Sequence, residues 1–446
     1  MKIILHKNLM SLLQNQGMLI VLLLLGLFLS FATLADQVPN DAEAGTVLVK
    51  TWPMNKVPNP VVIVVIRDLD EDLLFANAVV KQSLVLDGIV VEIVRGNPSD
   101  ARSCLEKLAN QGIKLDAIVC NHYTAGWSVF DRLNEKFPAL GNPIIIEPAS
   151  YRWPNFLKRD NLVNIMNQIA VIAILAVGMT FVILTGGIDL SVGALIAFSS
   201  VLVARLIRDY GGGVEAQVPA LILCCITTII VCAMMGAFSG IMVACFSIPS
   251  FITTLAMMLI AGGTAYLISE GQSIDRIPEQ FMWLGRGTTF FRIPIAVVLT
   301  GSIYLLAHLA MTQTIFGRYV YAVGGNCEAA RLSGVSVVTV LILVYTLSGA
   351  FAGLGGIIMA SQLKSGAPTY GHMYELYVIA AVVVGGTSLA GGEGKITGTL
   401  VGALILAVIQ NGMNLLGFDS NTQKCILGAL LLLAILLDKL KGRIAR

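Results

Sequence analysis

Charged side chains are scarce in this sequence of 446 residues, in which Asp, Glu, Lys and Arg together make up 13%. Ordinary soluble domains carry about 25%. The hydrophobic fraction is 56% and the mean hydropathy is +0.81. The formal net charge is only +2, so the strongly basic balance of a nucleic-acid-binding domain is absent. The composition therefore predicts a protein that lies mostly in a membrane.

Residue patterns for chemistry are also lacking. No Gly-x-x-x-x-Gly-Lys-Ser/Thr sequence occurs, so the chain does not hold ATP phosphates in that kind of loop. The four histidines form no Ser/His/Asp or metal-binding pattern, and the eight cysteines show no metal-ligand spacing. We therefore predict no catalytic residue, no metal and no cofactor. Cys104 and Cys120 could pair in an oxidising compartment, although we expect them on a helix and a strand, which argues against a disulfide.

The charges that do occur are concentrated in one segment. More than half of them fall within residues 36–160, which predicts a soluble domain set into a membrane protein. Apolar, β-branched runs alternate there with helical patterns, as is typical of a parallel sheet with helices on its faces. The expected strands are 61–69, 90–94, 115–120 and 143–146, and the expected helices are 71–86, 98–111 and 125–136.

An apolar run from about Met18 to Ala35 precedes this domain. The small residues at 32–35 would suit cleavage of a signal peptide. The run is also close to the ~20 residues that cross the core of a bilayer. Both interpretations stay open on these residues, and we favour an uncleaved first span.

Nine more apolar runs follow the domain and are too long for barrel strands, so only helices would satisfy their backbones in lipid. They lie near 165–186, 190–207, 217–245, 250–269, 293–312, 336–360, 375–391, 395–416 and 421–438. With the first run they make ten helices, which would place both ends of the chain on one side. The basic tail at 439–446 predicts that this side is cytoplasmic and that the soluble domain faces out.

Polar side chains are rare within these runs. Asp189 is the carboxylate that could lie at depth, where a charge is a candidate for function. Asp189 and Ser191 also follow two glycines and could simply cap a helix. A pathway for a neutral polar solute would be lined by polar residues and one aromatic residue: Thr185, Asp189, Phe251, Thr253, Thr254, Asn411 and Asn414.

The positions of the glycines suggest close helix packing and a possible internal repeat. Gly262–Gly263, Gly349, Gly353 and Gly355–Gly356 would let helices pack closely in lipid. Residues 186–193 also align with residues 385–392, Gly186–Gly187 matching Gly385–Gly386. Transporters are often built from internal repeats, but coincidence is the alternative in a chain with 44 glycines.

A short mixed-polarity stretch at 324–335 separates two long apolar runs. Asn326 is a good N-cap, Glu328 suits the positive end of a helix dipole, and Gly334 can end the helix in the left-handed conformation. We predict a helix of about two turns beside the membrane, with two adjacent alanines allowing close approach of a partner. A plain connecting loop is the alternative. The candidate contact residues are Asn326, Glu328, Ala329, Ala330, Arg331, Leu332, Ser333 and Gly334.

This stretch resembles the coupling-helix segment of bacterial ABC importer permeases of the ribose/monosaccharide type. Phe316–Val323 leads into Gly-Gly-Asn and then Ala-Ala-Arg-Leu-Ser-Gly-Val. Further similar blocks are Val177–Thr180 with Leu184–Gly193, Ile248–Leu255, Gly385–Gly392 and Asn411–Gly417. The resemblance covers roughly residues 154–441, in the order and spacing of the family.

The resemblance implies a polytopic α-helical permease subunit in the bacterial inner membrane, without enzymatic activity of its own. It implies a second permease subunit, a cytoplasmic ATPase dimer that holds residues 326–334, and a periplasmic binding protein that delivers a neutral sugar such as ribose. Permeases of this type begin with a span, so the expected parts are 1–35 with the first helix, an inserted periplasmic domain at 36–153, and the permease at 154–446. A membrane-anchored sensor and a permease for branched-chain amino acids are the alternatives.

The inserted segment carries a resemblance of its own. Residues 65–70, with Arg67 and Asp68, and residues 97–101 resemble one lobe of a type I periplasmic sugar-binding protein, which has a flavodoxin-like α/β fold. Such proteins clamp a ligand between two lobes. Because only one lobe is present, a complete binding site within this segment is not expected, and a generic α/β module without a ligand is the alternative.

Overall fold

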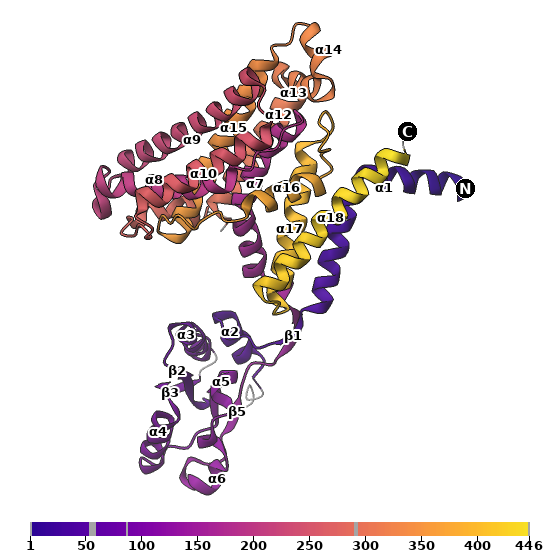
Figure 1. Ribbon diagram of the computed structural model, residues 1–446. Helices are drawn as coiled ribbons and strands as arrows, with labels where there is room; N and C mark the ends of the chain where they lie inside the picture. The colour runs from indigo at the N-terminus through magenta and orange to yellow at the C-terminus, as the bar shows by residue number, and fades with distance from the viewer. Residues whose placement is uncertain (1, 53–58, 86–87, 290–292, 445–446) are drawn as a thin grey trace. The chain divides into compact units, whose positions relative to one another are not determined.

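The structure is a computed structural model that describes residues 2–52, 59–85, 88–289 and 293–444. The chain forms two compact units, coloured by residue number in Figure 1. One unit is the segment Leu34–Trp153, and the other combines the residues up to Thr33 with those from Pro154 onward. Each unit is described separately.

The Leu34–Trp153 unit is built on a four-stranded, fully parallel sheet in the order β3-β2-β4-β5. Its strands are β2 (Val61–Arg67), β3 (Ile89–Gly96), β4 (Ala117–Cys120) and β5 (Ile144–Ile146). Its main helices are α2 (Ala42–Lys50), α3 (Asp70–Val85) and α4 (Pro98–Asn110). The sequence thus predicted the strands and the two longer helices, but not α2.

The continuous apolar run of β2 follows from its central position in the sheet. Ile63 and Val65 contribute to the core on one face, whereas Val62, Val64 and Ile66 contribute to the core on the other. Helices α2 and α3 supply residues to the second of these cores, and α4 supplies residues to the first. A strand that is covered on both faces loses the alternating pattern of a half-exposed strand.

The helix expected at 125–136 is wrong. The structure divides that region into α5 (His122–Ala125), a 3₁₀ turn at Ser128–Phe130 and α6 (Leu133–Lys136). Arg132 adopts a left-handed backbone with φ +54°, which interrupts any continuous helix. Apolar side chains of the region are still buried in the core of the first face, which explains its helical pattern.

Two short strands, β1 (Leu34–Gln37) and β6 (Tyr151–Pro154), pair where the segment begins and ends. The Gln37 side chain donates a hydrogen bond to the carbonyl of Trp153 at 2.9 Å, and Arg152 pairs with Asp36 at 3.3 Å. Cys104 and Cys120 are buried and unpaired, so the disulfide that we allowed for is not formed. Their places on α4 and β4 agree with the argument against it.

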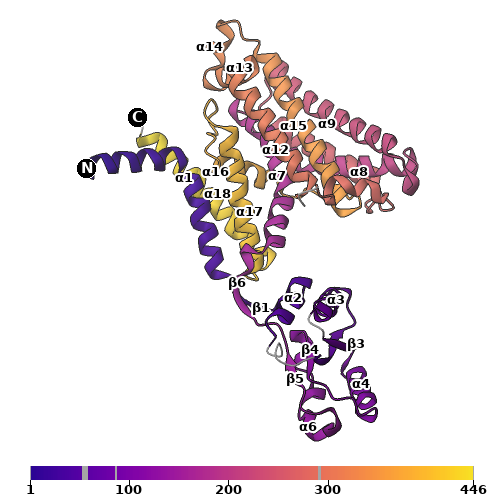
Figure 2. The ribbon, with the colours of Figure 1, turned by 180° about the vertical axis from the view of Figure 1, so that it is seen from behind.

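The second unit is helical (Figures 1 and 2). Each expected apolar run contains a helix: α1 (Lys2–Ala32), α7 (Arg159–Leu184), α8 (Val192–Asp209), α9 (Val218–Phe246), α10 (Ser250–Ser269), α12 (Ile295–Gln313), α15 (Val337–Leu363), α16 (Tyr374–Val384), α17 (Ile396–Leu415) and α18 (Ser420–Ile444). The run expected at 375–391 is helical only as far as Val384. Among the described residues, six of these are long and apolar enough to cross a membrane, namely α7, α9, α10, α12, α15 and α17. Two shorter apolar helices lie at Gly17–Ala32 and Tyr374–Val384. The chain is therefore a multi-pass membrane protein.

Helix α15 packs against α7, α8 and α9, and its glycines make this possible. A Cβ at Gly349 would lie 2.4 Å from the carbonyl oxygen of Cys232 on α9, and one at Gly356 would lie 2.6 Å from that of Ile196 on α8. These approaches confirm the predicted packing role at both positions. Gly263 differs, because its Cα faces open space.

Helix α1 packs against α17. The buried Leu29 side chain occupies the position that a side chain at Gly412 would need. At the end of α1, the Thr33 carbonyl accepts a hydrogen bond from the Asn155 amide, and the Thr33 hydroxyl accepts one from the Phe156 amide. The chain thus leaves and re-enters the helical unit at neighbouring residues that are joined by these hydrogen bonds.

Candidate functional site

The stretch at 324–335 forms the predicted short helix, α14 (Cys327–Leu332), directly after α13 (Ile315–Gly325). The Asn326 side chain accepts a hydrogen bond from the Ala329 amide at 3.0 Å, as an N-cap does. Gly334 has φ +85° and ends the helix in the left-handed conformation. Figure 1 shows α14 at the far end of its helical unit, next to α13.

The outer surface of α14 combines an ion pair with an exposed leucine. Arg331 and Glu328 pair at 2.8 Å, and both side chains are mostly exposed. Leu332 is 82% exposed. Helix α14 thus presents one exposed apolar side chain beside an exposed ion pair. Ser333 and Ala329 are exposed as well.

Ala330 differs from the other candidate contact residues of α14. Ala330 is only 5% exposed and belongs to the core of its own unit. A larger side chain there would disturb the packing of α14 rather than a partner. Of the two adjacent alanines, Ala329 alone is free for close approach.

The base of α14 rests on backbone contacts between glycines. A Cβ at Gly324 would lie 1.7 Å from the carbonyl oxygen of Leu184, at the end of α7. The same carbonyl accepts a hydrogen bond from the Gly392 amide at 2.9 Å. Tyr321 of α13 donates a hydrogen bond to the carbonyl of Gly394 at 2.8 Å. Tyr321 could not be singled out in the sequence, because a tyrosine in an apolar run gives no sign of its hydrogen-bond partner.

The two similar glycine segments, 186–193 and 385–392, lie in contact here. Their alignment in the structure differs by one residue from the expected one. Gly186 and Gly386 both have positive φ, +79° and +84°, and each lies two residues after the last residue of a helix. A Cβ at Gly391 would lie 3.0 Å from the Gly186 amide nitrogen. The matching glycines are therefore Gly186 and Gly386, rather than Gly186 and Gly385. Both glycines end a helix in the left-handed backbone conformation.

Asp189 is buried between α8 and α15. One carboxylate oxygen accepts hydrogen bonds from the Ser191 amide (2.9 Å) and hydroxyl (2.6 Å), and the other accepts one from the Ser348 hydroxyl at 2.7 Å. Asp189 does not cap α8 as expected, because Ser191 holds the N-cap position and its side chain makes no capping bond. No cationic side chain pairs with Asp189 in the described part of the chain.

The expected pathway residues differ in how exposed they are in the structure. Thr254 is fully buried, and its hydroxyl donates to the carbonyls of Ile188 (3.2 Å) and Ser250 (2.9 Å), so its place is inside the subunit. Thr185 bonds to its own helix, at the carbonyl of Val182. Thr253 is buried, whereas the neighbouring Phe251 is 53% exposed.

The two asparagines lie elsewhere. Asn411 is buried and exchanges hydrogen bonds with Asn161 at 2.7 and 3.1 Å, which holds α17 to α7. Asn414 is exposed and accepts a hydrogen bond from Gln423 at 2.8 Å. Only Phe251 and Asn414 among the expected pathway residues are therefore well exposed on the surface of the unit.

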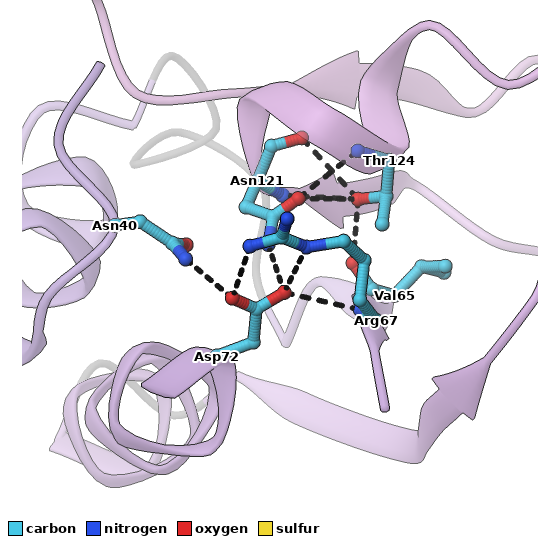
Figure 3. Close-up of polar contacts among 6 residues, drawn as sticks. All are labelled: Asn40, Val65, Arg67, Asp72, Asn121 and Thr124. Carbon is cyan, nitrogen blue, oxygen red and sulfur yellow. Dashed lines mark hydrogen bonds and ion pairs between the residues drawn. The ribbon is translucent and has the colours of Figure 1, made fainter. Parts of the chain in front are cut away.

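The α/β unit has a polar network at the carboxyl ends of β2 and β4, shown in Figure 3. The fully buried carboxylate of Asp72 accepts hydrogen bonds from Arg67, Asn40 and Asn121. The Thr124 hydroxyl extends the network to the carbonyl of Val65. Burial alone would raise the pKa of the Asp72 carboxyl. The hydrogen bonds from Arg67, Asn40 and Asn121 have the larger, opposite effect, so the pKa is lowered.

Ligands of parallel sheets bind at this edge, where the strand order reverses. Here the edge is occupied by the chain's own groups. Arg67 is committed to Asp72 and stacks over the Tyr123 ring at 3.8 Å. Asp68, which we singled out in the sequence, is exposed and pairs with Arg95 instead. Asp72 could not be singled out in the sequence, because it looks like an ordinary acidic residue in the first turn of a helix.

Residues 161–435 match the family described as branched-chain amino acid transport system / permease component. The chain belongs to this permease family. The chain is 41% identical over 324 residues to the ribose import permease of Escherichia coli (strain K12), covering 72% of this chain and 97% of that protein. It is 38% identical to the L-arabinose transport permease of the same strain, covering 66% and 87%. An inner membrane ABC transporter permease of that strain is 39% identical over 57% and 76% of the two chains. No solved structure matches the chain.

Proposed function

We propose that this permease is the membrane subunit of an ATP-driven ABC importer for a neutral sugar such as ribose or arabinose. The observation that carries the proposal is α14, a capped helix with an exposed Leu332, which directly follows the close backbone contacts of Gly324 in α13. A signalling bundle has no need of such a surface. The relatives named for ribose and L-arabinose import support the sugar class over branched-chain amino acids.

The partners follow from this role. A cytoplasmic ATPase dimer would hold α14 through Glu328, Arg331 and Leu332, and would hydrolyse the ATP. A second permease subunit would complete the pathway in the lipid bilayer, and a periplasmic binding protein would deliver the sugar. Ten spans, with α1 retained as the first, would place α14 in the cytoplasm and residues 36–153 in the periplasm.

The proposed orientation predicts opposite labelling of two cysteines. In a background without the other cysteines, Asn110→Cys should react with an impermeant maleimide in intact spheroplasts, because α4 would face out. The native Cys327, which is exposed at the start of α14, should react only after the membrane is opened. Labelling of Cys327 in sealed spheroplasts would reverse the topology and remove the cytoplasmic role of α14.

The α/β unit would be a fixed lobe on the side where the binding protein docks. A tethered surface acts at a high effective concentration, so even weak contacts with the binding protein would count. Deletion of residues 37–152 with a short linker from Asp36 to Trp153 should leave an inserted permease, because Thr33 and Phe156 keep their hydrogen bond within the helical unit.

In this deletion variant we expect unchanged basal ATPase activity of the complex. The concentration of loaded binding protein needed for half-maximal stimulation should rise, with little change in the maximal rate. A titration of the binding protein against ATPase activity measures both quantities. Identical titrations for parent and deletion would show that the lobe is a passive insertion.

A further inference from the structure

The loop between α7 and α8, residues 185–191, and Leu184 just before it contact α13, α10 and α15. At its beginning, the Leu184 carbonyl meets Gly324 of α13 and the amide of Gly392. Only Asn326 separates α13 from α14. A displacement of α14 that moves the end of α13 therefore also moves the end of α7, because no side chain separates the backbones of Gly324 and Leu184.

Four residues later, the same loop is bonded to the first turn of α10. The Ile188 amide donates to the Ser250 hydroxyl at 3.3 Å, and the Ile188 carbonyl accepts from the Thr254 hydroxyl at 3.2 Å. Both backbone groups of one loop residue are thus held by α10. Phe251, in the same turn of α10, is 53% exposed on the surface of the unit.

Asp189 fixes the loop against α15. Its carboxylate binds Ser191 on one side and the Ser348 hydroxyl of α15 on the other. Gly187 lies so close to Tyr345 of α15 that a Cβ there would be 2.4 Å from the phenolic oxygen. Close-packed groups of this kind transmit displacements instead of absorbing them.

We propose that residues 185–191 carry the movement of α14 to the first turn of α10, with Thr254 and Asp189 as positioning residues. This rests on the proposed function, since it gives the ATPase-driven movement of α14 a route through the subunit. The three contacts lie within seven residues of chain, which leaves little slack between them. Small shifts at one end then appear at Phe251, where a second subunit or the solute can meet them.

The test uses Thr254→Val in the full complex, with Thr254→Ser as the conservative variant. The matched control is Thr228→Val on α9. Thr228 is equally buried, and among the described residues its hydroxyl bonds only to its own helix, at the Cys224 carbonyl. Ser348→Ala is a second, independent break, at the Asp189 contact. For each complex, the amount of bound ATPase, the basal activity and the activity with loaded binding protein are measured.

We expect Thr254→Val and Ser348→Ala to keep bound ATPase and basal activity and to lose about fivefold or more of the stimulation, the size of an ordinary coupling between two sites. Thr254→Ser and Thr228→Val should behave as the parent. Full stimulation in both Thr254→Val and Ser348→Ala would overturn the proposal, as would an equal loss in Thr228→Val. A parent complex that holds no ATPase would instead refute the proposed function itself, so the two failures are distinguishable.

Discussion

Leu332→Asp is expected to abolish stimulation of the ATPase by the loaded binding protein and to weaken the association of the ATPase with the permease. Leu332 is 82% exposed, so the substitution leaves the permease folded. A charge placed at the centre of an apolar contact is left without a partner when that contact forms. We expect Leu332 to be one of the few residues that carry most of the binding energy, so its loss should cost about 2 kcal/mol, which is about a 30-fold weaker affinity.

The measurement is co-purification of the ATPase followed by its activity with and without loaded binding protein. Arg331→Glu should act in the same direction, because it also breaks the pair with Glu328. Leu74→Asp is the matched control, since Leu74 is an exposed leucine of α3 in the α/β unit, outside the membrane-spanning helices. A normal ATPase yield and normal stimulation in Leu332→Asp would remove α14 from the interface.

Asp72→Asn is expected to destabilise the α/β unit by about 3 kcal/mol, the lower end for breaking one side of a buried ion pair, because Arg67 is still 30% exposed. The amide keeps the shape of the carboxylate but adds donors toward Asn40 and Asn121, which are donors themselves. The control is Asp68→Asn, since Asp68 is 73% exposed in its pair with Arg95 and should cost no more than about 1 kcal/mol.

The lowered pKa of Asp72 also fixes the sign of a pH effect. A carboxyl with a folded-state pKa below its unfolded value stabilises the fold above the unfolded pKa. That stability is lost as the pH falls through the folded pKa. Protease resistance of the unit in the full chain, followed against temperature at neutral and acidic pH, measures both effects. Equal resistance of Asp72→Asn and Asp68→Asn would contradict the role of the network.

The hydrophobic periodicity of the sequence predicted most helices and strands, because it directly reflects which residues are buried. The parallel sheet followed from continuous apolar strands, and α14 followed from Asn326 and Gly334. The helix at 125–136 failed because apolar spacing does not reveal a left-handed residue at Arg132. Whether a segment is a helix or a strand was therefore more predictable than whether a helix is interrupted.

The site was predictable only where its signals are local. The caps of α14 lie within a few residues of each other, so the sequence shows them. The burial of Ala330, the Asp189–Ser348 contact and the Asp72 network depend on residues brought together by the fold, 49 and 159 positions apart in two of the hydrogen bonds. Thr254 was taken for a pathway residue because a polar group in an apolar run has the same appearance whether it faces a solute or a neighbouring loop.

The most direct test of the proposed function is uptake of radiolabelled ribose by proteoliposomes that contain the full chain with its co-purified ATPase and the loaded binding protein. Arabinose and leucine serve as competing solutes, and ATP is supplied on the side of α14. We expect ribose accumulation that requires ATP and the binding protein, is reduced by arabinose, is unaffected by leucine and is absent in Leu332→Asp. Solute movement that is independent of ATP, or a full chain that binds no ATPase, would contradict the assignment as an ABC importer subunit.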